Sequence, residues 1–324
     1  SNDLASSASP TTIETAWKRR EAAMLALGTA QEVIERQINA GNVEFDIKGF
    51  LENIVLPDLA NPVSPFLLGR CLWIGSKFPK HLSRYQAIEN VEMSTAQNLA
   101  NSPMGRFVEA TVRGLQADQL AVVRIAAVRA IWGFCSHLRS TASLARKSQQ
   151  ASRPGLQDES SIERALLNPV LPAAIDALVN MCTTFSGSTE ILGLILENMA
   201  VVLACDATFT ASYESKVSPL AIAIFLKYST DPVLTSVIQD IFRVIAETPG
   251  CLAPLETRLV PTLVSILDAT VSTDTSINRG TTENEGGSNL TNGVPPGLQA
   301  VALDVLQTLV RASAVTSTTS TTST

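Results

Sequence analysis

Residues 216–222 read Lys-Val-Ser-Pro-Leu-Ala-Ile, and related segments that carry a proline return along the chain. The other copies are Ile-Val-Leu-Pro-Asp-Leu at 54–59, Pro-Val-Leu-Pro-Ala-Ala-Ile at 169–175 and Arg-Leu-Val-Pro-Thr-Leu-Val at 258–264. The last three prolines, Pro172, Pro219 and Pro261, are separated by 47 and then 42 residues, which is the spacing of HEAT or armadillo helical repeats. Proline is tolerated near a helix start and kinks a helix when it lies further in, so we interpret it here as a geometric feature of the repeat.

The apolar residues have helical periodicity. They recur at i, i+3, i+4 and i+7 through most of the chain, as in 120–138 and 233–246, which is typical of amphipathic helices. Aromatic residues make up only 5% of the chain, and the Asn-Gly pair at 292–293 lies in a polar tract rather than between strands, so signals for β-hairpins are weak. The sequence therefore predicts an all-α fold, a HEAT-repeat α-solenoid in which antiparallel helix pairs stack into a superhelix.

The predicted solenoid is a single segment over residues 13–315, with one leading helix at 14–38 and five repeats. The expected helix pairs are 49–60 with 63–78, 103–116 with 119–138, 168–185 with 188–204, 215–229 with 232–247, and 256–268 with 297–312. Insertions are expected at 79–102, 139–166 and 270–294, and disordered tails at 1–12 and 316–324. Basic residues between 139 and 153 predict a solvated, weakly helical loop.

Composition and charge restrict the class of protein. The 324 residues are 45% hydrophobic and 17% charged, which supports a large folded core. A net charge of -6 and a pI near 5.1 argue against direct nucleic-acid binding and favour basic protein partners. No apolar run approaches the roughly 20 residues of a membrane span, and no leader peptide opens the chain, so we expect no membrane association and a place in the cytosol or nucleus.

Residues that carry chemistry are scarce. The chain has two histidines and five scattered cysteines, without the paired spacing of a metal site, so we expect neither a metal nor a cofactor. Cys135 and His137 are the one close Cys/His pair, but residues two apart on a helix point to different faces. No phosphate-binding loop or nucleophile elbow is present. The sequence therefore predicts that the chain is not an enzyme.

Polar stripes on the second helices of the repeats are the candidate protein-binding residues. At helical spacing, each stripe shares one face of its helix, and stacked repeats would align the stripes into an extended surface. The alternative is that they are the ordinary solvated faces of half-buried helices. The candidates are Glu190 and Glu197 in the third repeat, Asp240, Arg243 and Glu247 in the fourth, and Asp304 and Arg311 in the fifth.

Two pairs of large side chains in the first repeats are expected to be structural. Arg124 and Arg129 lie in the segment 122–132, and arginines at such positions can pair with acidic residues of the adjoining repeat and hold its register. Trp73 and Trp132 lie at similar places in the first two second helices, and we expect both to fill the core.

Several stretches together resemble nuclear transport receptors of the importin-β (karyopherin-β) superfamily. They are residues 15–30, 64–73, 123–135, 209–228 and 258–267, in the same order and spacing as in those receptors. The resemblance implies a HEAT-repeat superhelix that imports core histone dimers and other basic or ribosomal cargo, binds Ran-GTP, can meet nuclear pore proteins, and shuttles between cytoplasm and nucleus. These receptors are much longer, so the chain would be a middle arc. The three insertions depart from the family pattern.

Two other classes of function stay open from the residues alone. A generic HEAT-repeat scaffold would bind proteins without any dependence on Ran. An enzyme carried on a helical scaffold would require a cleft with converging titratable groups, and two histidines in 324 residues argue against it.

Overall fold

The computed structural model describes residues 10–83, 101–149, 167–274 and 297–320, and the regular structure in these ranges is entirely helical. Neighbouring helices pack in pairs and layers, which confirms the predicted all-α, HEAT-repeat class of fold. The described helices include none with the length and apolarity to cross a bilayer. The chain forms two compact units, residues 1–181 and 182–324, whose boundary falls inside helix α11 (Leu171–Thr184).

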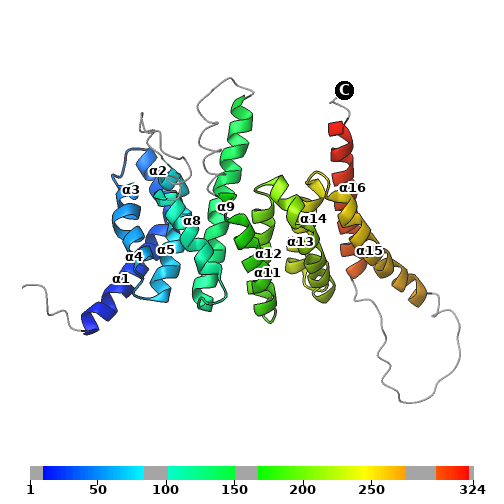
Figure 1. Ribbon diagram of the computed structural model, residues 1–324, viewed down its shortest axis with the longest axis horizontal. Coiled ribbons are helices and arrows are strands. Elements are labelled where there is room, and N and C mark those ends of the chain that lie inside the picture. The colour runs from blue at the N-terminus through cyan, green and yellow to red at the C-terminus, as the bar shows by residue number, and fades with distance from the viewer. Residues whose placement is uncertain (1–9, 84–100, 150–166, 275–296, 321–324) are drawn as a thin grey trace, which may run out of the picture. The chain divides into compact units, whose positions relative to one another are not determined.

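The N-terminal unit stacks its longer helices in one layer. Helix α1 packs against α5, and α5 packs against α9, while α8 pairs with α9 (Figure 1). The elements of this unit before α11 are α1 (Pro10–Thr29), α2 (Gln31–Asn39), α3 (Ile47–Phe50), the π-helix η1 (Leu51–Val55), α4 (Leu56–Ala60), α5 (Pro65–Lys77), α6 (Pro79–Ser83), α8 (Pro103–Leu115) and α9 (Ala121–Gln149).

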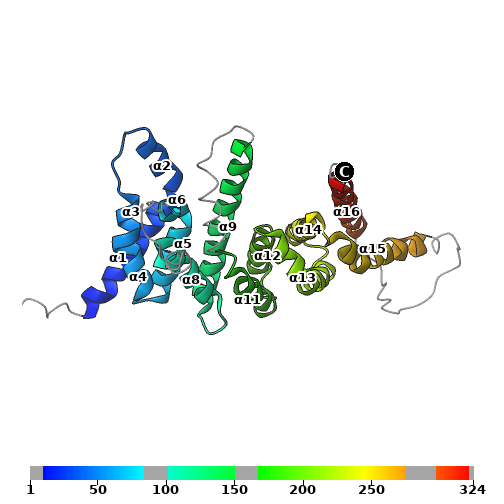
Figure 2. The same ribbon diagram turned by 45° about the horizontal axis from the view of Figure 1, so that its top comes forward.

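The C-terminal unit repeats this arrangement. Its second helices α12, α14 and α16 lie side by side in sequence order, and α13 contacts α15 on the other side of the layer (Figures 1 and 2). The elements are α12 (Thr189–Leu203), α13 (Ala207–Lys227), α14 (Pro232–Glu247), α15 (Leu252–Asp274) and α16 (Leu298–Ser320).

Short polar side chains begin many of the helices. Helices α5 and α14 begin in this way: the Ser64 hydroxyl accepts from the N–H of Phe66, and Asp231 accepts from two backbone N–H groups at 3.0 and 3.1 Å. Ser102, Ser188 and Asp206 cap α8, α12 and α13 in the same way. Each cap satisfies N–H groups that have no partner within the helix.

The recurring prolines lie at different depths within their helices. Pro57 follows the π-helical turn η1, because a proline has no N–H to donate and its ring displaces the carbonyl one turn earlier. Pro219 and Pro261 lie inside α13 and α15, further from the helix starts than the predicted helices at 215–229 and 256–268 imply. The difference arises because Asp206 caps α13 and Gly250, with φ of 82°, ends the preceding turn, so both helices begin early.

Other helices also exceed the predicted bounds. Helix α9 continues to Gln149 through part of the insertion expected at 139–166, α15 enters the insertion expected at 270–294, and α16 reaches Ser320 inside the tail expected from 316. Helix α1 begins at Pro10, inside the tail expected at 1–12. Proline suits a first helical position, and neither glycine nor proline occurs from 298 to the C-terminus to stop α16. Helix α6 lies at the start of the insertion expected at 79–102. Apart from residues 101–102, the rest of the insertions and tails lies outside the described residues.

The leading helix expected at 14–38 is two helices. The chain bends at Ala30, between α1 and α2. The Thr29 hydroxyl donates to the carbonyl of Leu25 at 2.8 Å, a back-bond that bends helices because it competes for the carbonyl. Helix α2 then meets α6 through Glu35, which lies 2.7 Å from Lys80 Nζ.

Candidate functional site

All seven predicted stripe residues are exposed on the second helices of the C-terminal unit. Helix α14 carries Asp240, Arg243 and Glu247 between α12 and α16, so the three stripes belong to one contiguous layer. The three charged residues of α14 face solvent because the opposite face of the helix is apolar and packs into the core. On that face Leu234, Ile238, Ile241 and Ile245 are almost fully buried. The structure thus brings Glu190, Glu197, Asp240, Arg243, Glu247, Asp304 and Arg311 onto neighbouring helices, as an extended surface would require.

The charges within this layer are not independent. Arg243 lies 2.8 Å from Asp240 and 3.7 Å from Glu247 on the same helix, so it neutralises part of the acidic stripe. The hydrogen bond to Asp240 raises the pKa of the Arg243 guanidinium, and the side chain therefore stays charged. Glu190 accepts a hydrogen bond from the Ser188 hydroxyl at 3.0 Å. The pKa of the Glu190 carboxyl is lowered, mainly by a hydrogen bond from its own backbone N–H and to a smaller extent by the Ser188 hydroxyl. The stripe on α12 is fully acidic, whereas that on α14 is partly compensated.

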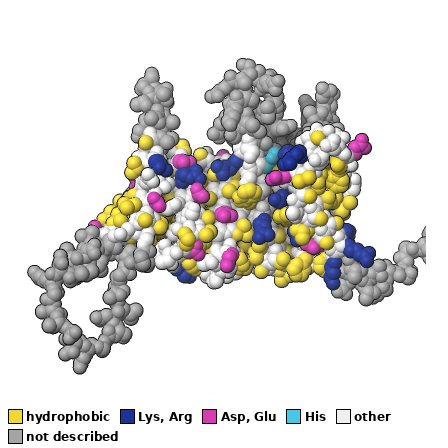
Figure 3. Space-filling view, turned by 180° about the vertical axis from the view of Figure 1, so that it is seen from behind, with side chains coloured by type: hydrophobic (Ala, Val, Ile, Leu, Met, Phe, Trp, Pro, Cys, Tyr) yellow, Lys and Arg dark blue, Asp and Glu magenta, His cyan; other side chains and the backbone are white. Residues whose placement is uncertain are grey.

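Charged side chains of both signs are interspersed on the face seen in Figure 3. Surface pairs of this kind contribute little to stability, because water screens them. Exposed charges of this kind can steer and orient a charged partner. The candidate residues lie where such a partner could reach them.

Four of the five cysteines are buried, and Cys205 is partly exposed. Burial raises the pKa of the Cys71 and Cys182 thiols to about 12, and Cys135 is also inaccessible. A thiol acts as a nucleophile only as the thiolate. Among the described residues, no group of three or more His, Cys, Asp or Glu is placed to hold a metal ion.

Arg124 links α9 to the adjoining repeat, as predicted, although the hydrogen bonds below are to an amide and a backbone carbonyl rather than to a carboxylate; Arg129 makes no such link. The Arg124 side chain is 5% exposed, donates from Nη2 to Asn180 Oδ1 at 3.1 Å on α11, and donates from Nε to the carbonyl of Leu115 at 3.3 Å. It therefore connects α9 to α11. Arg129 is exposed and makes no hydrogen bond or ion pair with any other described residue, because it lies on the opposite face of α9. For Arg129 the prediction is wrong within the described part of the chain.

The prediction that both tryptophans fill the core is also wrong for Trp132, which is 46% exposed. It follows Arg129 by three residues on α9, so it shares the open face of that helix. Trp73 is half-buried: it packs against Gly28 of α1, and Arg70 and Lys77 lie over its ring at 4.9 and 5.6 Å from the centroid.

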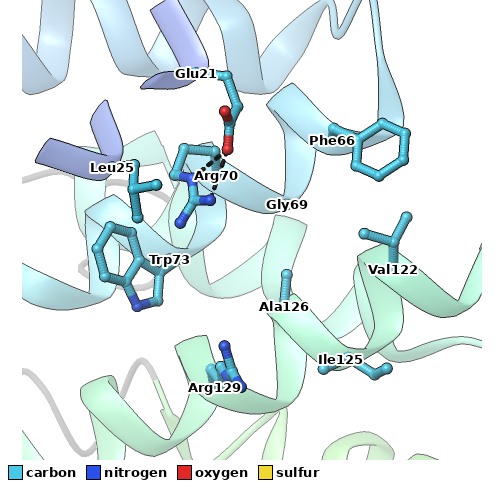
Figure 4. Close-up of a pocket in the computed structure, with 10 residues that line it drawn as sticks. All are labelled: Glu21, Leu25, Phe66, Gly69, Arg70, Trp73, Val122, Ile125, Ala126 and Arg129. Atoms are coloured by element: carbon cyan, nitrogen blue, oxygen red, sulfur yellow. Dashed lines mark hydrogen bonds and ion pairs between the residues drawn. The ribbon is translucent and has the colours of Figure 1, made fainter. Parts of the chain in front are cut away.

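A groove in the N-terminal unit is the feature that sequence reasoning missed. It has a volume of about 510 Å³ and lies between α1, α5 and α9, the second-helix layer of this unit (Figure 4). Trp73 and Arg129 line it, although the sequence pointed to them only as structural residues. The sequence held one indication of this groove: the small residues Gly69 and Ala126, each flanked by large side chains on its own helix. Such positions let two helices approach closely.

No protein-family model matches the chain. Importin-9 of Drosophila melanogaster is 30% identical to it over 298 residues, which cover 91% of this chain. The chain spans 23% of the length of that relative. The sequence stretches that indicated the importin-β superfamily resemble importin-9 in particular, and this comparison confirms the resemblance. Over nine tenths of its length, the chain is therefore similar to one segment of an importin-9-like protein.

Proposed function

We propose that this chain is a segment of a nuclear import receptor that binds basic protein cargo, such as a core histone dimer, and releases it under the control of Ran-GTP. The similarity to importin-9 over 91% of the chain is the observation that carries the proposal. The receptor would shuttle between cytoplasm and nucleus, and its action would be conformational and electrostatic, without a covalent step. Ribosomal proteins are a second class of basic cargo that the same surface would suit.

The acidic second-helix layer of the C-terminal unit is the proposed cargo surface. Glu190, Glu197, Asp240, Glu247 and Asp304 are exposed on three adjacent helices, and together they outnumber Arg243 and Arg311. Complementary charge raises the rate of association with a basic partner and fixes its orientation.

The first experiment measures binding of the 324-residue chain to a core histone dimer across a salt series, with and without Ran-GTP. Neutralising the five carboxylates as Glu190→Gln, Glu197→Gln, Asp240→Asn, Glu247→Gln and Asp304→Asn should weaken binding about tenfold at low salt, from roughly 0.3 kcal/mol for each exposed charge. Because salt screens exposed charges, the difference should shrink as ionic strength rises. The matched control is Glu256→Gln with Asp268→Asn on the first helix α15, where no loss is expected because these carboxylates lie outside the second-helix layer.

Arg243 offers a test with the opposite sign. Replacing it by alanine frees Asp240 and Glu247 from their ion pairs, so affinity for the histone dimer should rise a fewfold at low salt, by roughly 1 kcal/mol or less. Titration by fluorescence anisotropy of a labelled histone dimer would measure the change. A loss of affinity on Arg243→Ala would contradict the proposed acidic surface.

A generic HEAT-repeat scaffold is the alternative function. It predicts protein binding that Ran-GTP does not alter. If the chain binds no histone dimer while the complete receptor does, the segment sets curvature rather than holding cargo. If binding occurs but Ran-GTP changes nothing in the complete receptor, the scaffold function replaces the transport function.

A further inference from the structure

The groove of the N-terminal unit is built by the packing of α5 on α9. A Cβ atom added to Gly69 would lie 3.0 Å from the Cβ of Ala126, so the two helices approach closely here and these two small residues form the floor of the groove. Phe66 and Val122 lie at one end and Trp73 and Arg129 at the other (Figure 4). Large side chains on either side of a small floor leave a recess that a single side chain of a partner can enter.

The walls expose more apolar surface than helix packing requires. Phe66 is 57% exposed and Leu25 is 41% exposed. Trp17 stacks on Phe66, with ring centroids 6.4 Å apart and planes 9° from parallel, which holds Phe66 upright beside the recess. Aromatic and apolar side chains that are exposed together and lie beside a recess are typical of protein-binding sites.

The charge of the groove is positive. Glu21 is its one lining carboxylate, and Arg70 already neutralises it, with Nε at 2.7 Å and Nη2 at 2.6 Å from Glu21 Oε1. The other arginine that lines the groove, Arg129, makes no ion pair with another described residue, so its positive charge is not compensated there. The groove thus has the opposite charge preference from the acidic second-helix layer of the C-terminal unit.

We infer that this groove binds a short segment of a partner protein that carries an aromatic or large aliphatic side chain next to a carboxylate. The apolar side chain enters the recess over Gly69 and Ala126, and the carboxylate pairs with Arg129 at the rim. An arginine beside aromatic rings suits this role, because its planar group can bind a carboxylate with two hydrogen bonds. The site would therefore bind an acidic partner that differs from the basic cargo, and it does not rest on the proposed transport function.

The tryptophans give this site its own reporter. The chain has three tryptophans: Trp17 stacks on a wall residue, Trp73 lines the groove, and Trp132 follows on α9. Intrinsic tryptophan fluorescence of the full chain can thus follow a titration without any label. The probes are the capped peptide Glu-Asp-Phe-Glu-Leu, a basic version Lys-Arg-Phe-Lys-Leu, and an acidic version without apolar side chains, Glu-Asp-Ser-Glu-Ser.

The acidic apolar peptide should change the tryptophan emission saturably, whereas the other two should bind at least about tenfold more weakly. The variant Arg129→Glu should weaken the acidic peptide about tenfold or more and favour the basic one, since it reverses the charge at the rim. Arg113→Glu on α8, an exposed arginine of the same unit, is the matched control and should leave binding unchanged. Phe66→Ala should weaken both phenylalanine peptides. Far-UV circular dichroism should match the parent chain for both variants. Melting should match for Arg129→Glu, whereas Phe66→Ala should melt slightly lower because it loses the stack on Trp17.

Equal binding of the acidic peptide to the parent chain and to Arg129→Glu would overturn the inference, as would no binding up to millimolar peptide. The chain's own acidic segment around Asp158, Glu159 and Glu163 is a competing occupant. If the peptide binds only after these three residues are changed to Asn or Gln, the occupant is that segment and the proposal of a partner protein fails. Binding that persists unchanged in this triple variant supports an external partner.

Discussion

Replacing Arg258 by alanine is expected to destabilise the C-terminal unit by about 3 kcal/mol. Arg258 on α15 forms an ion pair with Glu214 on α13, whose side chain is only 6% exposed. Removal of the arginine leaves a buried carboxylate without its partner, which costs more than the ion pair itself contributed. The expected loss is at the lower end of the usual range because the Arg258 side chain is 36% exposed, so water can enter.

Hydrogen exchange followed by mass spectrometry should show the loss as faster exchange in α13 and α15. Arg311→Ala on α16 is the matched control, an exposed arginine of the same unit, and should change the free energy of unfolding by less than about 0.5 kcal/mol. The double variant Glu214→Leu with Arg258→Met should recover most of the stability, because it removes both charges together. If Arg258→Ala is as stable as the parent chain, the pair does not join these helices.

The change Gly133→Ala is expected to destabilise the N-terminal unit by about 2 kcal/mol. A Cβ atom at Gly133 on α9 would lie 2.6 Å from the backbone carbonyl oxygen of Ser76 on α5, and a backbone oxygen cannot rotate away. We expect strain of about 3 kcal/mol from moving the two helices apart, offset by the roughly 1 kcal/mol that alanine contributes over glycine in a helix. Urea unfolding followed by tryptophan emission measures this unit, because all three tryptophans belong to it.

Gly193→Ala provides the matched comparison on α12. The nearest atom to an added Cβ there is a side-chain carbon of Leu234 at 3.6 Å, an ordinary contact. The substitution should therefore stabilise the protein by about 0.5 to 1 kcal/mol, measured as a higher melting temperature by circular dichroism. Equal effects of the two substitutions would show that helix propensity, not the close approach of α5 and α9, decides the result.

The class of fold could be predicted from the sequence because it depends on periodicity. The spacing of apolar residues places α14 with Leu234, Ile238, Ile241 and Ile245 in the core, and Asp231 begins that helix whatever its neighbours are. The stripe residues are exposed for the same reason, since a helix that buries one face must present the other. Helix ends were predicted less well, because Asp206 and Gly250 start α13 and α15 earlier than the prolines indicated, and no glycine or proline ends α16 at the predicted residue 312.

The groove could not be predicted, because its residues come together only when three helices pack. Glu21, Arg70 and Arg129 lie on α1, α5 and α9, and the sequence does not state which face of one helix meets which face of another. The same limit explains Trp132, which is a large aromatic residue of the kind expected in a core and yet lies on the solvent-exposed side of α9.

Local sequence thus determined the helices, their proline turns and the acidic character of the second helices in the C-terminal unit, because each depends on residues within a turn or two. Tertiary structure alone decided that Arg124 joins α9 to α11 while Arg129 is exposed on the other side of α9. Both are arginines on one helix, five residues apart, which places them on opposite sides of its axis. Which side is buried depends on which helix packs there, and Arg124 lies on the side of α9 that meets α11.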